Sequence, residues 1–138
     1  MWIALAVLAS CKTAIGEGVS RPDTGRLHYL DASTRELVQP IEPADAVHKF
    51  VRVEVAEVVN PKMHGVIFEL YYQAREGERS HVGGFALYPS DHPGRFLVAT
   101  QGKVKNGGAL VLVLTSPDKV ERGDPLRVGI ARIELVEK

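Results

Sequence analysis

Apolar and polar residues alternate with a period of two through most of the C-terminal two-thirds of the chain. In the first such run, Val51, Val53 and Val55 alternate with Arg52 and Glu54. Similar alternation recurs at residues 66–73, 82–87, 96–99, 110–114 and 126–135. A period of two is typical of β-strands that bury one face and expose the other. The pattern therefore predicts about six strands.

The breaks between these runs contain residues that favour turns. They are Asn60-Pro61, Arg75–Glu78, Pro89–Gly94, Asn106–Gly108 and Ser116–Asp118. Short strands at regular spacing, without a sustained helical period, predict an all-β chain with a single antiparallel β-sandwich of immunoglobulin-like or jelly-roll-like type. Residues 109–114 are apolar at consecutive positions. This segment is predicted to be a central strand covered on both faces, or a surface that meets a partner.

The chain before residue 47 has a different character. Glycine, proline and serine cluster between Gly16 and Gly25, which indicates a loop or flexible linker. Leu27–Leu30 and Leu37–Ile41 could each pair briefly as an edge strand, because Pro40 cannot occupy a central one. We therefore expect three parts, with a signal peptide at residues 1–10, a lipidated cysteine and linker at 11–46, and the sandwich at 47–138.

The N-terminal segment carries the most specific motif. An apolar stretch, Trp2–Leu8, runs into the sequence Leu8-Ala9-Ser10-Cys11, and Cys11 is the single cysteine. This arrangement resembles the signal and lipobox of a bacterial lipoprotein, except that no Lys or Arg opens the segment. The resemblance implies cleavage before Cys11 and acylation of its thiol with membrane lipid. The alternative is a buried first strand or helix with an inert thiol.

The lipobox resemblance also implies a location. The protein would be anchored in the cell envelope, facing the periplasm or the exterior. Lys12 follows the cysteine, so the outer membrane is expected over the inner one in an organism that uses Asp there for retention. The apolar segment is too short to span a bilayer by itself.

Composition excludes several classes of function. The chain has 17 basic and 17 acidic residues, which argues against a nucleic-acid binder with its basic face. A single cysteine cannot form an internal disulfide, so folding must depend on apolar burial. The sequence has no zinc-type Cys/His spacing, and we expect no cofactor and no metal.

Three short segments of the β-region carry a second resemblance. They are His48–Val53, His81–Tyr88 and Leu126–Leu135. Their order resembles the C-terminal β-sandwich of the tyrosinase and polyphenol oxidase family over residues 47–136, although Val51 stands where plant members have Asp. The dicopper domain, with its two sets of three histidines, has no counterpart in this sequence. The resemblance therefore implies a fold and an accessory or shielding role, and it implies no oxidase activity.

The remaining candidate chemistry lies in predicted loops. Met63-His64 and His92 could bind copper through thioether and imidazole groups, but polar loop residues are usually solvated, and that interpretation is favoured. Ser90, Asp91 and His92 are adjacent, so their side chains cannot adopt the geometry of a catalytic triad. A turn is the simpler interpretation of this segment.

The glycine pair Gly83-Gly84 interrupts a predicted strand. Paired glycines in such a position suggest a β-bulge or a close approach of another segment. Such an approach could admit a partner, although packing is the favoured explanation. With the loop residues Ser90, Asp91 and His92, these glycines are the candidate interaction positions.

We expect that the protein is not an enzyme. We expect instead a membrane-anchored lipoprotein whose β-sandwich binds an envelope protein. One alternative is an accessory or shielding domain for a separately encoded copper oxidase. Another is a small envelope hydrolase or a carbohydrate-binding protein. Sandwich proteins usually place function on loops and edges, so the first interpretation directs attention there.

Overall fold

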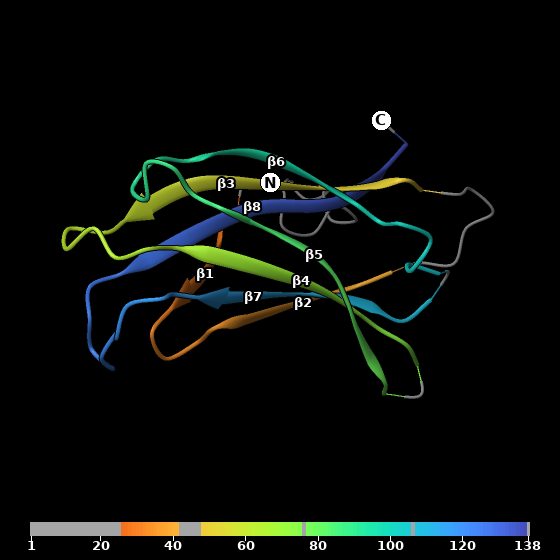
Figure 1. Ribbon diagram of the computed structural model, residues 1–138, viewed down its shortest axis with the longest axis horizontal. Coiled ribbons are helices and arrows are strands. Elements are labelled where there is room, and N and C mark those ends of the chain that lie inside the picture. The colour runs from red at the N-terminus through yellow and green to blue at the C-terminus, as the bar shows by residue number, and fades with distance from the viewer. Residues whose placement is uncertain (1–25, 42–47, 76, 106, 138) are drawn as a thin grey trace, which may run out of the picture.

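The computed structural model describes residues 26–41, 48–75, 77–105 and 107–137. These residues form eight strands and contain no helix (Figure 1). The strands are β1 (His28–Asp31), β2 (Glu36–Pro40), β3 (Phe50–Val59), β4 (Ile67–Gln73), β5 (Arg79–Ala86), β6 (Gly94–Ala99), β7 (Ala109–Thr115) and β8 (Arg127–Val136). Since the described residues form no helix, they include none that could cross a membrane. The predicted signal segment and lipidation site at Cys11 lie outside the described residues.

The strands form two antiparallel four-stranded sheets that pack face to face. One sheet has the order β1-β8-β3-β6 and the other has the order β2-β7-β4-β5. The pairs β4–β5, β3–β6, β2–β7 and β1–β8 are nested around the β4–β5 hairpin. This is the jelly-roll arrangement, in which one long hairpin folds over into two layers. The predicted all-β sandwich is confirmed, in its jelly-roll form.

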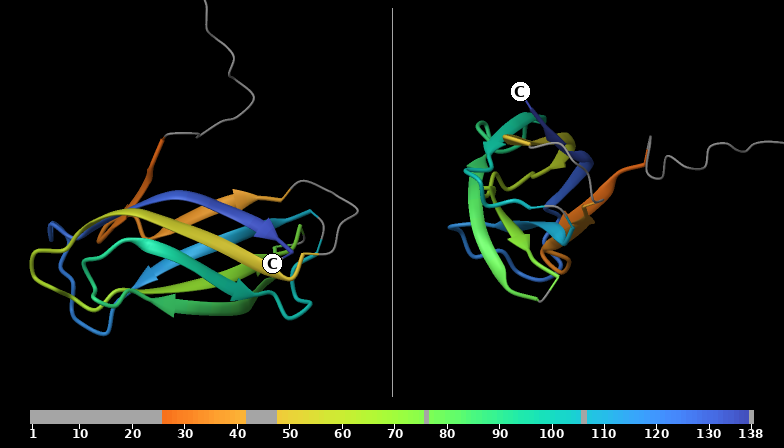
Figure 2. Two further views of the ribbon diagram at one scale, coloured as in Figure 1. Left: turned by 90° about the horizontal axis from the view of Figure 1, so that it is seen from above. Right: turned by 90° about the vertical axis from the view of Figure 1, so that its right-hand side faces the viewer.

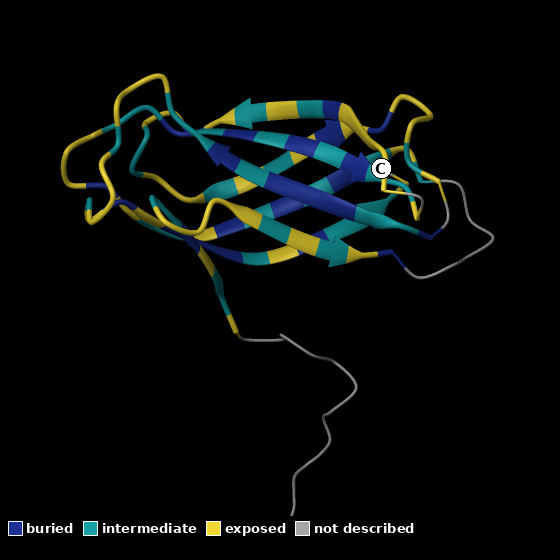
Figure 3. Cartoon of the chain, turned by 90° about the horizontal axis from the view of Figure 1, so that it is seen from below, coloured by how far each residue is buried: buried dark blue, intermediate teal, exposed yellow. Residues whose placement is uncertain are grey.

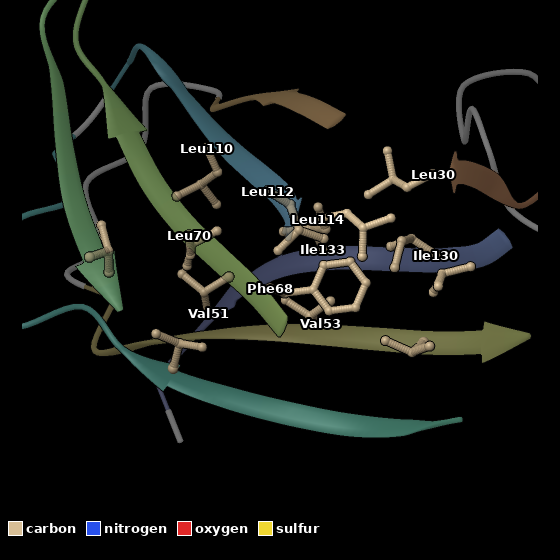
Figure 4. Close-up of a cluster of buried hydrophobic side chains, with 14 of the residues drawn as sticks. Leu30, Val51, Val53, Phe68, Leu70, Leu110, Leu112, Leu114, Ile130 and Ile133 are labelled. Carbon is tan, nitrogen blue, oxygen red and sulfur yellow. The ribbon is translucent and has the colours of Figure 1, made fainter. Parts of the chain in front are cut away.

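The core lies between the sheets and is built from alternate residues of each strand. Val51, Val53 and Val55 point inward from β3, while Phe68 and Leu70 do so from β4 (Figure 4). Burial alternates along the strands as expected for sheets with one wet face (Figure 3). The apolar residues that recur at every second position in the sequence are therefore the residues of this core.

Strand β7 is the exception to this alternation, as the sequence indicated. It lies between β2 and β4, and Val111 on its outer face is 0% exposed although it lies outside the core cluster. Val38 and Tyr71 are its cross-strand neighbours. The predicted central position of β7 is confirmed, and on its outer face the burial extends to Val111 alone.

The sandwich begins earlier than the boundary at residue 47 that the sequence indicated. β1 pairs with β8 and β2 pairs with β7, each at the edge of its sheet. Both segments were predicted to be capable of edge pairing, but they were grouped with the linker, whose glycine, proline and serine residues indicated a loop. Their residues complete the two outermost pairs of the jelly roll, so at least residues 28–40 belong to the folded domain.

The two glycines of β5 allow close packing at one side of the sandwich. A Cβ added to Gly83 would lie 2.7 Å from Cγ1 of Val98 on β6, in the opposite sheet. A Cβ added to Gly84 would lie 2.7 Å from the Phe68 carbonyl oxygen. The β4–β5 register shifts between Leu70 and Tyr71, so the predicted bulge is present beside the glycine pair. Both glycines thus have a packing role.

Candidate binding surface at one end of the sandwich

Four connections gather at one end of the sandwich and form a surface that we call the loop end. It consists of residues 32–35, 60–66, 87–93 and 116–126. Because successive strands run in opposite directions, alternate connections fall at the same end, as the left view of Figure 2 shows. Five of the eight prolines lie in these loops, namely Pro61, Pro89, Pro93, Pro117 and Pro125. Proline restricts the backbone, so these loops are restrained before any partner binds.

Asn60 joins two of the four loops from a buried position. It is 4% exposed, and its Nδ2 donates hydrogen bonds to the carbonyl oxygens of His64 (2.9 Å) and Ser90 (3.0 Å). Its Oδ1 accepts a hydrogen bond from the His64 backbone N–H at 3.0 Å. The side chain therefore satisfies backbone groups in both the 60–66 loop and the 87–93 loop.

A second polar cluster joins the 60–66 loop to the 116–126 loop. His64 Nε2 lies 2.9 Å from Oδ2 of Asp124, and His64 Nδ1 lies 4.0 Å from Oδ2 of Asp118. Lys62 Nζ is 3.4 Å from the same Asp124 oxygen. The side chains of His64 and Asp124 are only 15% and 3% exposed. The preferred prediction that His64 is a solvated loop histidine is therefore wrong.

The position of Asp124 affects its acidity. The hydrogen bond from His64 is the main cause of a pKa below the usual value of 3.8, and the backbone N–H of Leu126 lowers it further. Both contacts stabilise the carboxylate over the carboxylic acid. The Asp124 carboxylate thus contacts two side chains of the 60–66 loop, Lys62 and His64, and the cluster holds the two loops together.

The lowered pKa predicts how stability depends on pH. An ionised group with a lower pKa in the folded state stabilises the fold above its unfolded pKa, and this contribution disappears as pH falls through the folded pKa. Asp124→Asn should therefore be less stable than wild type near neutrality, and the difference should shrink as pH falls from about 5 to about 2. Urea denaturation across this range measures the effect.

A matched variant controls for the change in net charge. Glu121→Gln removes the same charge from an exposed position of the same loop without touching His64. A stability difference between wild type and Asp124→Asn that stayed constant across the acid range would contradict the proposed ionic role of Asp124.

The loop end also exposes two large side chains that the sandwich does not use. Tyr88 is 97% exposed and Met63 is 51% exposed. The Tyr88 loop is pinned on both sides, because Leu87 N–H donates to the Val66 carbonyl oxygen (3.0 Å) and Asn60 Nδ2 donates to that of Ser90. A braced loop with an exposed aromatic side chain is typical of a protein-binding surface.

The structure brings some of the sequence-derived candidates together and separates others. Ser90, Asp91 and His92 lie in the loop end, where His92 Nδ1 is 2.8 Å from Oδ1 of Asp91. Gly83 and Gly84 lie within β5 and pack against neighbouring strands. The glycine pair and the 90–92 turn are therefore separate features.

The sequence alone did not mark the residues that organise this surface. Asn60 and Pro61 were recognised as a turn, but nothing nearby indicates that Asn60 reaches Ser90. Asp124 lies 60 positions from His64, so no local pattern pairs them. Tyr88 could have been found, because an aromatic residue beside proline within a turn-rich segment is a candidate for exposure.

Other polar clusters have simpler arrangements. On the outer face of β4 and β5, His81 Nε2 lies 2.6 Å from Glu69 Oε1, and both groups face solvent. Within the described residues, no group of three or more His, Cys, Asp or Glu side chains is arranged to hold a metal ion.

No protein-family model matches the chain, and no curated protein or solved structure matches it either. The fold and the loop end define a jelly-roll sandwich with a restrained surface at one end. The resemblances to bacterial lipoproteins and to the tyrosinase C-terminal sandwich stay predictions.

Proposed function

We propose that the protein is a membrane-anchored lipoprotein of the cell envelope whose jelly-roll domain binds another envelope protein through the loop end. The observation that carries the proposal is Tyr88, a nearly fully exposed tyrosine on a loop braced by Asn60. Tyrosine side chains contribute strongly to binding energy, and a braced loop loses little entropy when it binds. The lipobox at Leu8–Cys11 supports the anchor.

The direction of β1 is compatible with the proposed anchor and the proposed binding surface. The described chain enters the sandwich through β1, which runs from His28 toward the loop end and finishes there at Asp31. A tether that precedes β1 would therefore leave the loops of this end free to meet a partner. A stalk of the length between Cys11 and Arg26 would allow the domain to stand off the membrane.

The anchor is tested by mass spectrometry of membrane fractions from bacteria that express the full chain. We expect a diacylated or triacylated N-terminus at Cys11, and we expect Cys11→Ala to lack it. An intact and unmodified Met1 in the soluble fraction would contradict the envelope location. The binding surface needs a separate experiment, because it could exist without the lipid.

The binding surface is tested by photo-crosslinking in intact cells. A benzoylphenylalanine at position 88 should yield a discrete crosslinked protein, whereas the same group at Val38, 52% exposed on the outer face of β2, should not. Tyr88→Ala should then weaken binding of the captured protein at least about tenfold, and Val38→Ala should not. Equal crosslinking at both positions would contradict a specific role of the loop end.

A further inference from the structure

Strand β6 is the outer edge of its sheet, and β3 is the one described strand that pairs with it (Figure 1). Thr100, directly after β6, donates its N–H to the Lys49 carbonyl oxygen at 2.9 Å. Hydrogen-bonded and non-hydrogen-bonded pairs alternate along an antiparallel ladder, so the peptide groups of Phe96 and Val98 also face β3. The intervening residues, whose peptide groups face away from the sheet, are Arg95, Leu97 and Ala99. Each of them offers one N–H and one carbonyl oxygen to a further strand.

The side chains of these three residues are also exposed, so the edge is open to solvent. Leu97 is 54% exposed on the outer face of the sheet, next to Arg52 of β3. The inward side chains of β6 are held by packing, because Phe96 stacks on Phe85 with ring centroids 4.3 Å apart and Val98 is buried. The strand is therefore a fixed template with an apolar side chain at its middle.

The other three edge strands have features that hinder pairing with a further strand. β1 is only four residues long, and β2 contains Pro40, which has no N–H to donate. On β5 the register shifts, and Lys103 Nζ donates to the His81 carbonyl oxygen at 3.1 Å. β6 has no proline, no lysine and no register shift, and its one charged residue is Arg95. Since proteins usually protect exposed edges, this unprotected edge suggests a surface that is used.

We propose that β6 pairs antiparallel with β6 of a second copy of this chain, about a two-fold axis at Leu97. Residues whose peptide groups face outward must lie opposite one another, which fixes the register. Leu97 then meets Leu97 of the second copy, and Arg95 meets its Ala99. This pairing forms about six hydrogen bonds and joins two four-stranded sheets into one continuous sheet.

The side chains that meet in this register are complementary in size and charge, which favours a second copy as the partner. The two Leu97 side chains bury apolar surface against each other at the axis. The long side chain of Arg95 lies opposite the small one of Ala99, so neither is crowded. No like charges lie directly opposite. Arg52, next to Leu97 in each copy, is already bound to its own Glu134 at 2.6 Å.

This interface is independent of the proposed function, because it leaves the loop end open. β6 begins at Gly94, directly after the 87–93 loop. The two β6 strands run antiparallel in the pair, so the loop ends of the two copies point in opposite directions. Either proposal can therefore fail without the other.

Sedimentation equilibrium of the full chain carrying Cys11→Ala tests for the dimer without disulfides between copies. An edge interface of this kind belongs to the small, transient class, so we expect a Kd on the order of 10 µM. Leu97→Lys places two ammonium groups at the axis and should weaken the dimer at least about tenfold. Val38→Lys, at a position 52% exposed on β2, should leave it unchanged. All variants share one N-terminal segment, so association through that segment would be equal in each.

Cysteine substitutions in the same background test the register. Opposite residues of a hydrogen-bonded pair have Cα atoms about 5.5 Å apart, which is within the range of a disulfide. Leu97→Cys should therefore form a covalent dimer on oxidation. Arg95→Cys and Ala99→Cys should each stay monomeric alone and should crosslink to each other when mixed.

Three results would overturn the inference. They are a monomeric wild type at about fifty times the expected Kd, a dimer of unchanged affinity in Leu97→Lys, and crosslinking of Arg95→Cys alone as efficient as that of Leu97→Cys. Thermal melting shows that each variant is folded, which is expected because all the substituted positions are exposed.

Discussion

Asn60→Ala should destabilise the protein by about 2–4 kcal/mol, a large share of the stability of a small domain. The substitution removes three hydrogen bonds at a buried position and leaves the backbone groups of His64 and Ser90 without partners. The penalty arises from those unsatisfied groups more than from the lost bonds themselves. Urea denaturation at neutral pH, followed by circular dichroism, measures the change.

Two variants make the Asn60 result specific. Ser90→Ala keeps the carbonyl group that accepts from Asn60, so its stability should stay within about 0.5 kcal/mol of wild type. Asn60→Asp keeps an acceptor for His64 N–H but places a buried carboxylate oxygen against the carbonyl oxygens of His64 and Ser90, so near neutral pH it should be at least as unstable as Asn60→Ala. A loss below about 1 kcal/mol in Asn60→Ala would mean that water replaces the side chain and that the loops do not depend on it.

Gly108→Ala is expected to be at least as damaging, for a steric reason. Gly108 has φ +72°, and a Cβ there would collide with the carbonyl oxygen of Gln73 on β4 and lie 3.0 Å from the Tyr72 hydroxyl. Gln73 O is backbone and cannot rotate away, so β4 or the 100–108 connection must shift. The Gly108 carbonyl oxygen also accepts from Ile41 N–H at 3.0 Å, so a shift would disturb the end of β2. We expect a loss of about 3–5 kcal/mol.

Gly102 provides the matched control for Gly108. It has a similar φ of +73° in the same connection, but a Cβ there would meet nothing within 4 Å. Gly102→Ala should therefore show only the cost of the left-handed backbone, about 1–2 kcal/mol. The difference between the two variants in thermal or urea unfolding measures the steric contact alone. Equal losses at the two positions would show that backbone conformation explains both.

The fold class could be predicted because its cause is local. The alternation of Val51, Val53 and Val55 with charged residues encodes a strand with one buried face, whatever strand lies next to it. The pairing of strands has no such local signal, because β1 and β8 lie about a hundred residues apart and any edge could in principle accept β1. For the same reason the short strands β1 and β2 were assigned to the linker.

The candidate site was harder to predict than the fold. The turn at Ser90–His92 and the glycine pair were visible as breaks in the pattern, but neither break indicates which distant residue it contacts, Asn60 at Ser90 and Val98 at Gly83. His64 shows the difficulty best. Its sequence neighbours indicate a solvated loop, whereas Asp124 and Asp118 from a distant connection surround it. Contacts between loops depend on the order of the strands in the sheets. That order depends on the whole chain, so no local sequence pattern predicts these contacts.

The nesting of strand pairs has a consequence for how the protein reaches its destination. β8 lies hydrogen-bonded between β1 and β3, so neither neighbour can complete its sheet before the last described strand has been made. A ribosome synthesises the chain from its N-terminus, so β8 is made after the strands that it pairs with. Pairing between strands that lie so far apart in the sequence is also slow. The growing chain should therefore lack its complete sandwich until β8 has been made. For a protein that we propose is exported, this delay would keep the chain threadable through a narrow membrane pore.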